Sequence, residues 1–142
     1  MAEDRYKWTI CQGGATSDVM RPLFHPSVEG ITVEDILHAL SDPVRVCIFA
    51  EIARAQSPQT CSAFLDIIDR TVPKSTLSQH FKVLREAGLI KSERKGVEMH
   101  NTPRCDEIDE RFPGLLAAII AAHKMQIERQ RRVHRKRRAK AA

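Results

Sequence analysis

The sequence predicts a mainly α-helical domain with a small β-hairpin. One observation is an apolar stripe at helical spacing, Leu77, Phe81 and Leu84, in a stretch bounded by Pro73 and Gly88. A second is a pair of short extended segments that surround a basic, glycine-containing turn directly after that stretch. A third is composition, because 42% of the residues are hydrophobic but only 5% are aromatic, which favours an aliphatic core built from helices.

The length of 142 residues leaves room for one domain with extensions. We expect a flexible N-terminal arm (1–30), a folded domain (31–123) and a basic C-terminal tail (124–142). The net charge of +5 is unevenly distributed, because the tail has nine Lys and Arg residues against one Glu. Residues 70–104 form a second basic region, and both regions favour a polyanionic partner.

The N-terminal sequence and the spacing of the cysteines indicate the cellular compartment. With Glu3 and Asp4, the N-terminus has no basic start or apolar run of a signal peptide, and no run approaches the ~18 apolar residues of a membrane span. The four cysteines are widely separated and form no Cys-x-x-Cys motif, which fits a reducing compartment. We therefore expect a cytoplasmic protein.

The N-terminal arm shows no sustained periodicity, so it predicts little structure of its own. It nevertheless contains Tyr6 and Trp8, the only Tyr and Trp of the chain. Aromatic side chains favour an arm that wraps around a second subunit. The alternative is a tail without contacts.

The domain should begin with a helix near Val33, for which Thr32 is a plausible N-cap. The segment Ser41-Asp42-Pro43 is expected to end the first helix and to cap a second helix over residues 43–55. A short third helix is expected over residues 63–69. A two-residue turn then leads to the fourth helix, which contains the apolar stripe. Two short helices joined in this way form a helix-turn-helix.

The fourth helix has a face of short polar side chains opposite its apolar stripe. The residues on this face are Lys74, Ser75, Ser78, Gln79 and Lys82. Hydroxyl and amide groups can donate to and accept from base edges, and lysines can contact phosphates. The pattern predicts a recognition helix for DNA.

A β-hairpin is expected directly after this helix, from segments 89–93 and 97–101. Its predicted tip carries Arg94 and Lys95, which could lie along a phosphate backbone. Such a hairpin is a wing, and a helix-turn-helix followed by a wing is more specific than either alone. The fold class is therefore a winged helix-turn-helix.

The C-terminal part should contain a short helix over residues 105–111 and a long last helix from Leu115. The first eight residues of the last helix are apolar nearly all round, so one neighbouring face cannot bury them. We therefore expect a two-fold homodimer. Residues 129–140 are densely basic, which predicts non-specific attraction to DNA or, alternatively, a solvated disordered run.

Two segments resemble the arsenic-repressor-like (ArsR-type) winged-helix regulators of bacteria: 39–45 (ALSDPVR) and 75–90 (STLSQHFKVLREAGLI). The resemblance covers roughly residues 33–122. It implies a dimeric repressor that binds a palindromic operator, is released by an inducer, and forms its interface from the first and last helices. The implied interface residues are Ile36, Leu37, Leu115, Leu116, Ile119 and Ile120. The implied major-groove residues are Ser75, Thr76, Ser78, Gln79 and His80, with Lys74 and Lys82 near phosphates and Arg94 and Lys95 on the wing.

Many members of this family sense metals, but this chain departs from their ligand patterns. Their third-helix site needs a close pair of thiols, and no second thiol lies near Cys61. In the last-helix site, Arg111 follows Asp109 where a histidine is needed. We therefore expect no metal and no other cofactor. A metal-sensing repressor is a minor alternative, and it would require an inter-subunit site assembled from Cys11 and Cys61.

Two other inducers are left open. Cys47 and Cys61 are candidates for a thiol redox switch, although each thiol is better explained as a small buried hydrophobe. The other inducer is a small organic molecule in an aliphatic cleft at the dimer interface.

An enzyme is not expected. Ser75 and His80 lie close in sequence, but no acid is placed to orient the histidine and no glycine-rich elbow exposes a serine. The sequence predicts a sequence-specific DNA-binding repressor. The alternative from another class is an architectural, nucleoid-associated protein that binds DNA through its basic tail.

Overall fold

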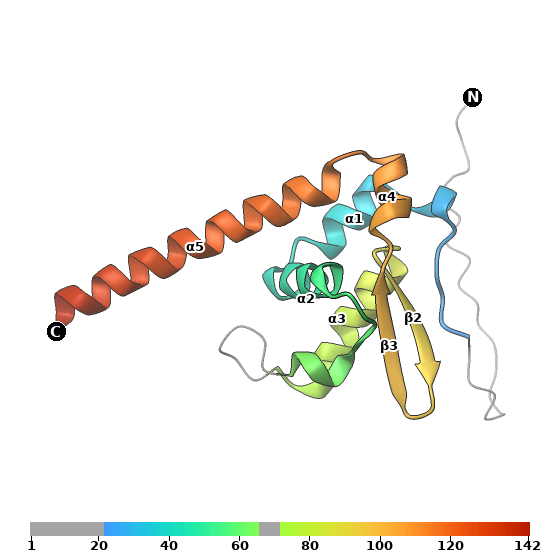
Figure 1. Ribbon diagram of the computed structural model, residues 1–142, viewed down its shortest axis with the longest axis horizontal. Helices are drawn as coiled ribbons and strands as arrows, with labels where there is room; N and C mark the ends of the chain where they lie inside the picture. The colour runs from blue at the N-terminus through green and yellow to red at the C-terminus, as the bar shows by residue number, and fades with distance from the viewer. Residues whose placement is uncertain (1–21, 66–71) are drawn as a thin grey trace.

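The computed structural model describes residues 22–65 and 72–142, and it confirms the mainly α-helical winged fold (Figure 1). The α-helices are α1 (Val33–Ala39), α2 (Pro43–Arg54), α3 (Lys74–Glu86), α4 (Cys105–Arg111) and α5 (Leu115–Ala141). Two short 3-10 helices are η1 (Val28–Gly30) and η2 (Cys61–Phe64). The strands β1 (Gln59–Thr60), β2 (Ile90–Lys95) and β3 (Glu98–Pro103) form an antiparallel sheet in the order β1-β3-β2.

The starts of α1 and α2 follow from capping side chains that the sequence predicts. The Thr32 hydroxyl accepts from the Asp35 N–H at 3.1 Å. The Asp42 carboxylate accepts from the Val44 N–H at 2.8 Å and from the Arg45 N–H at 3.2 Å. Both caps satisfy backbone donors that the first turn of a helix leaves unpaired.

The core is formed where α1, α2, α3 and the start of α5 meet the sheet. The apolar stripe of α3 is fully buried, and the Phe81 ring packs edge-on against Phe64 with centroids 5.6 Å apart. This packing fixes which face of α3 points outward. The most deeply buried large apolar side chains are Ile31, Ile36, Ile48, Phe49, Ile52, Leu77, Leu84, Leu89, Ile90 and Ile108.

The end of α3 depends on Gly88. Its φ of 82° is left-handed, and the Leu89 N–H donates to the Leu84 carbonyl at 3.0 Å, which closes the helix. A Cβ at this position would lie 2.5 Å from a side-chain carbon of Ile31. Gly88 is therefore required both for the backbone conformation and for the close approach of Ile31.

The third helix predicted over residues 63–69 is described only in part. The structure shows η2 up to Phe64, and residues 66–71 lie outside the described part of the chain. Gln59 begins β1, a short strand that the sequence does not predict. Gln59 pairs with Asn101, so a third strand widens the wing into a small sheet.

The hairpin turn lies two residues later than the sequence predicts. Lys95 pairs with Glu98, which leaves Gly96 and Val97 as a two-residue turn with a positive φ of 64° at the glycine. Arg94 and Lys95 are therefore the last residues of β2 and not its turn. The expected tip position of these two side chains is corrected, because the glycine occupies the turn position that needs positive φ.

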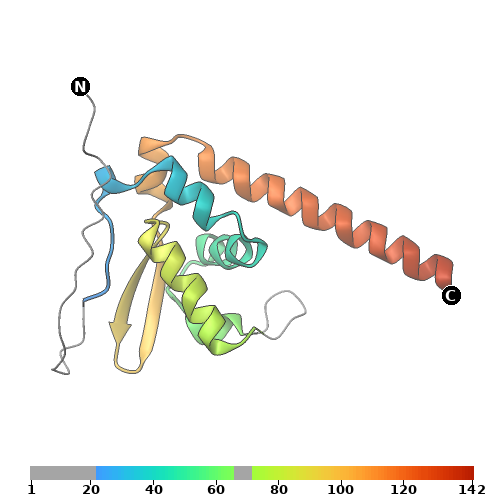
Figure 2. The ribbon, with the colours of Figure 1, turned by 180° about the vertical axis from the view of Figure 1, so that it is seen from behind.

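The basic tail continues α5 without a break, so no structural boundary occurs at residue 124. Every side chain after Ile127 is exposed. In Figures 1 and 2 the C-terminal half of α5 extends away from the rest of the domain as a single rod.

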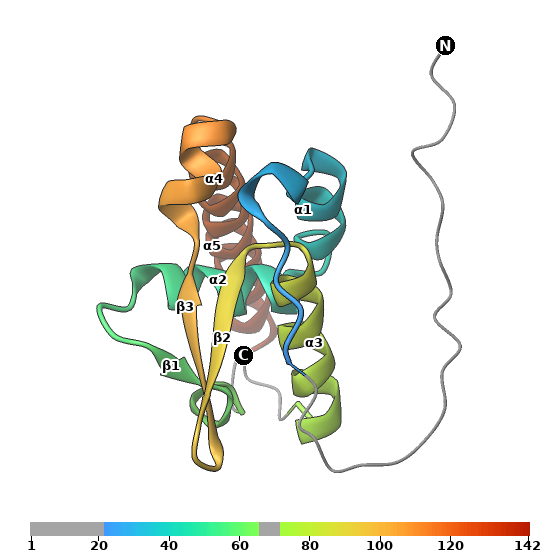
Figure 3. The same ribbon diagram turned by 90° about the vertical axis from the view of Figure 1, so that its right-hand side faces the viewer.

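The last nine residues of the predicted arm are part of the structure and contact the domain. In Figure 3 they run beside β2, which is the outer strand of the sheet. The Ser92 N–H of β2 donates to Nε2 of His25 at 2.9 Å. The predicted boundary at residue 30 is therefore too late, because this segment satisfies a donor on the sheet edge. Tyr6, Trp8 and Cys11 lie outside the described residues.

Two arginines also bind backbone carbonyls of residues 22–30. Arg104 donates to the Pro26 carbonyl at 2.8 Å, and Arg111 donates to the Val28 carbonyl at 2.9 Å. We call residues 22–30 the strap, because these contacts tie them to β2 and to both ends of α4.

The strap contact through His25 requires a neutral imidazole, since Nε2 accepts a hydrogen bond there. Burial lowers the pKa of His25, and a hydrogen bond with the Leu23 backbone opposes this effect. The positive charges of Arg85, Arg104 and Lys91 lower the pKa further. The folded protein thus binds this proton less readily than the unfolded chain does.

We expect the contribution of His25 to stability to be complete above pH ~6.5 and to be lost as the pH falls through the lowered folded pKa. Urea unfolding at several pH values between about 5 and 7.5 checks this. His25→Gln keeps an acceptor but does not titrate, so it should lose less stability on acidification than the wild type. His134→Gln, at an exposed position of α5, serves as the control. Equal pH dependence of the wild type and His25→Gln would contradict the assignment.

Candidate DNA-binding surface

The outward face of α3 carries the predicted recognition residues. Its first turn begins after Pro73, and the burial of the apolar stripe turns the polar side chains to solvent. His80 is half-buried at the edge of this face. The exposed residues are Lys74, Ser75, Thr76, Ser78, Gln79 and Lys82.

The hairpin lies beside this face. In Figures 1 and 3 the N-terminal end of α3 and the turn between β2 and β3 are at the same end of the molecule. Arg94 and Lys95 are exposed near that turn. The geometry therefore places a polar helix face and a basic strand end where one extended partner could contact both.

The cations of this surface differ in how they are paired. The Lys82 ammonium lies 3.9 Å from the Glu86 carboxylate on the same helix, so part of its charge is compensated. Within the described residues, Lys74 and Lys95 make no ion pair with a carboxylate. We expect these two lysines to contribute more than Lys82 to attraction for phosphates.

Asn101 anchors the hairpin, and the sequence did not single it out. Its side chain is fully buried and accepts from the Ser92 hydroxyl at 2.7 Å. Its amide donates to the Gln59 carbonyl at 3.0 Å and contacts Cys61 Sγ at 3.6 Å. One residue thus joins all three strands to η2 and fixes the hairpin relative to the rest of the domain.

Known proteins share part of this sequence. Residues 40–93, from the end of α1 into β2, match the family described as a helix-turn-helix domain. The HTH-type transcriptional repressor SmtB of Mycobacterium tuberculosis is 34% identical to this chain over 65 residues, in strains CDC 1551 / Oshkosh and ATCC 25618 / H37Rv alike. Part of this chain is thus similar to a helix-turn-helix domain and to a helix-turn-helix repressor.

The likeness is local rather than complete. The matched stretch covers 46% of this chain and 45% of the length of SmtB, so the chain spans less than half of these relatives. The solved structure of an ArsR-like transcriptional regulator from Rhodococcus sp. RHA1 is 23% identical. The superposed part covers 75% of this chain and 90% of the Rhodococcus chain, and the TM-score is 0.46.

The interface residues inferred for an ArsR-type dimer divide into two groups in this structure. Ile36 and Leu116 are buried in the core of one chain, so they offer no surface to a second subunit. Leu37 is 51% exposed, and Leu115, Ile119 and Ile120 are half-buried. The core covers one side of the apolar start of α5 and leaves another side accessible.

The candidate redox thiols are not activated. Burial raises the pKa of Cys47, and the nearby Glu51 carboxylate raises it further. Burial is also the largest cause of the raised pKa of Cys61. Cys47 lies on the α5 side of α2, whereas Cys61 contacts Asn101 beside the sheet. Both thiols are therefore kept protonated, which disfavours rapid oxidation.

Within residues 22–65 and 72–142, no group of three or more His, Cys, Asp and Glu side chains could hold a metal ion. None of the helices in this part of the chain is long and apolar enough to cross a membrane.

Proposed function

We propose that this chain is an ArsR-type, sequence-specific DNA-binding transcriptional regulator, and specifically a repressor that an inducer releases from a palindromic operator. The observation that carries this proposal is the exposed hydroxyl and amide face of α3 beside the basic end of the hairpin. A helix fits the major groove, where each base pair presents a distinct pattern of donors and acceptors.

Different residues of this surface are assigned to reading the base sequence and to attracting the DNA backbone. Ser75, Thr76, Ser78, Gln79 and His80 are assigned to base edges, because their short polar groups can both donate and accept. Lys74 and Lys82 are assigned to phosphates at the two ends of this face. Arg94 and Lys95 are assigned to the backbone beyond it, where phosphate contacts position the protein without reading sequence.

A homodimer would explain a palindromic operator, since two-fold symmetry in the protein is matched by two half-sites. The dimer is supported by the apolar side chains that the single chain leaves accessible. Leu37 on α1 and Met125 on α5 are 51% and 71% exposed, respectively. Ile119 and Ile120 continue the same apolar part of α5.

Among inducers, a small organic molecule is favoured over thiol oxidation, because both candidate thiols have raised pKa values. A metal inducer is the minor alternative. It would need ligands from a second subunit or from the undescribed residues, such as Cys11.

The competing function is that of an architectural protein that binds DNA through the basic end of α5. The observation in its favour is that residues 128–142 are all exposed and carry eight Lys and Arg residues against one Glu. Such binding would be electrostatic and would not select a sequence.

A fluorescence-anisotropy titration separates the two functions. The reduced full-length protein is titrated against DNA from upstream of its own gene and against a scrambled duplex of equal length at physiological salt. A repressor should favour the native fragment by ~1,000-fold or more. It should keep most of this ratio when residues 129–142 are deleted, whereas an architectural protein should show a ratio near one and lose nearly all binding on deletion.

A further inference from the structure

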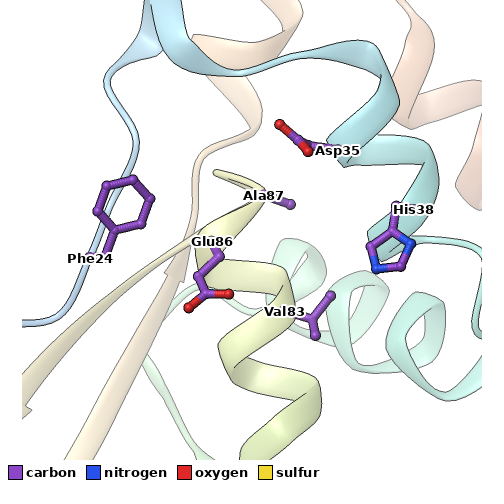
Figure 4. A pocket seen from close by; sticks show the side chains of 6 residues that line it. All are labelled: Phe24, Asp35, His38, Val83, Glu86 and Ala87. Atoms are coloured by element: carbon purple, nitrogen blue, oxygen red, sulfur yellow. The ribbon is translucent and has the colours of Figure 1, made fainter. Parts of the chain in front are cut away.

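Two of the hollows in the described residues lie between elements of the folded domain and are wide enough for a small molecule. The first, of about 530 Å³, lies between Phe24 of the strap, α1 and the end of α3 (Figure 4). Its carboxylates already have partners in the protein. Asp35 accepts from the Thr32 hydroxyl at 2.7 Å, and Glu86 pairs with Lys82. This hollow does not require a ligand to satisfy its charges.

The second hollow is a groove of about 590 Å³ between α2 and α5, within the usual size range of ligand pockets. Its apolar surface comes from small or aliphatic side chains on both helices: Ala50, Ala53, Ile120 and Ile127. Cys47 lies beside them with a protonated thiol, which adds to the apolar surface.

The charged groups around this groove are unevenly paired. Glu51 is bound by Arg54 on the same helix, so this pair is neutral. In the described chain, Lys124 and Arg131 make no ion pair, and Glu128 is the one carboxylate of the lining without a cation. The groove therefore has a net positive rim above an apolar floor.

His123 adds a second, independent observation. It lines the groove, and its Nε2 atom is buried without a hydrogen-bond partner in the described residues. Buried polar atoms are normally hydrogen-bonded, so an unpaired one calls for a specific explanation. The Nε2 atom of His123 is therefore available to a bound polar group.

We infer that the α2–α5 groove binds a small organic molecule with an aliphatic body and a carboxylate. Lys124 and Arg131 would hold the carboxylate by charge-assisted hydrogen bonds, with His123 as a further partner. The aliphatic body would lie against Ala50 and Ile120. A cationic or neutral ligand of the same shape would leave these charges uncompensated.

This inference rests on the proposed repressor function in one respect, since it names the chemical class of the inducer. Because α2 packs against both α3 and α5, a ligand in the groove contacts the helix that supports the recognition helix. Coupling of this kind is reciprocal, so a ligand that weakens DNA binding must itself bind less tightly to the DNA complex.

The test uses isothermal titration calorimetry of the full-length protein without DNA. Octanoate is the probe, and octan-1-ol and octylammonium are the matched ligands with other head groups. We expect octanoate to bind at least tenfold more tightly than either. Lys124→Gln and Arg131→Gln should each weaken octanoate by roughly tenfold or more. Arg135→Gln, one turn further along α5 and outside the lining, should leave the affinity unchanged.

Four results would overturn the inference: no binding of octanoate at millimolar concentration, equal binding of octylammonium, equal loss in Arg135→Gln, or competition by a second subunit. In the last case the affinity would fall as protein concentration rises, in step with dimer formation measured by sedimentation. Since the assay contains no DNA, its failure is distinct from failure of the operator titration.

Discussion

Replacing Asn101 with Ala should lower the free energy of unfolding by roughly 2–6 kcal/mol. The substitution leaves the Ser92 hydroxyl and the Gln59 carbonyl without their partner, and a buried unpaired polar group costs about 1–3 kcal/mol. Urea unfolding followed by circular dichroism measures this loss.

The neighbouring residue provides the control for this prediction. Thr102 is half-buried, and its hydroxyl makes only a long contact of 3.5 Å with the Lys91 carbonyl. Thr102→Ala should therefore change the unfolding free energy by about 0.5 kcal/mol or less. An equal effect of the two substitutions would show that Asn101 does not anchor the hairpin.

The contrast between these neighbours explains what the sequence could and could not predict in the fold. Helix ends depend on residues a few positions apart, so Thr32, Asp42 and Gly88 were identified locally and the structure confirms them. Asn101 depends on strand register, which pairs it with Ser92 and Gln59 across the sheet. A two-residue error in the turn position is enough to hide such a pairing.

The candidate site, like the fold, can be predicted from the sequence only in part. The polar face of α3 follows from helical periodicity, and the structure places those side chains in solvent. The interface residues could not be separated in the same way, because an apolar side chain fits a core as well as a subunit contact. Ile36 and Leu116 turn inward since α1 and α5 each pack one side against the domain. Similarly, the sequence does not reveal the strap, because the contact between His25 and Ser92 joins residues 67 positions apart.

Replacing Gln79 with Ala should weaken binding to the native upstream DNA by roughly 1–3 kcal/mol, or about 5- to 150-fold. A glutamine amide can donate to and accept from one adenine at the same time, and alanine can do neither. Binding to the scrambled duplex should not change, because random DNA offers no matched base. Gln79 is exposed, so the folded state should keep its stability.

Lys95→Ala tests whether the hairpin contacts only the phosphate backbone of DNA. Because a lysine at the end of β2 would contact only phosphate, its loss should weaken native and scrambled DNA about equally and reduce the salt slope by about one. Gln56→Ala, an exposed glutamine in the loop after α2, should affect neither duplex. The two substitutions are thus distinguished by the ratio of the affinity for native DNA to the affinity for scrambled DNA. Gln79→Ala should lower this ratio, and Lys95→Ala should preserve it. If both substitutions acted alike on the two duplexes, α3 would not be the element that reads sequence, and the proposed repressor would bind DNA by charge alone.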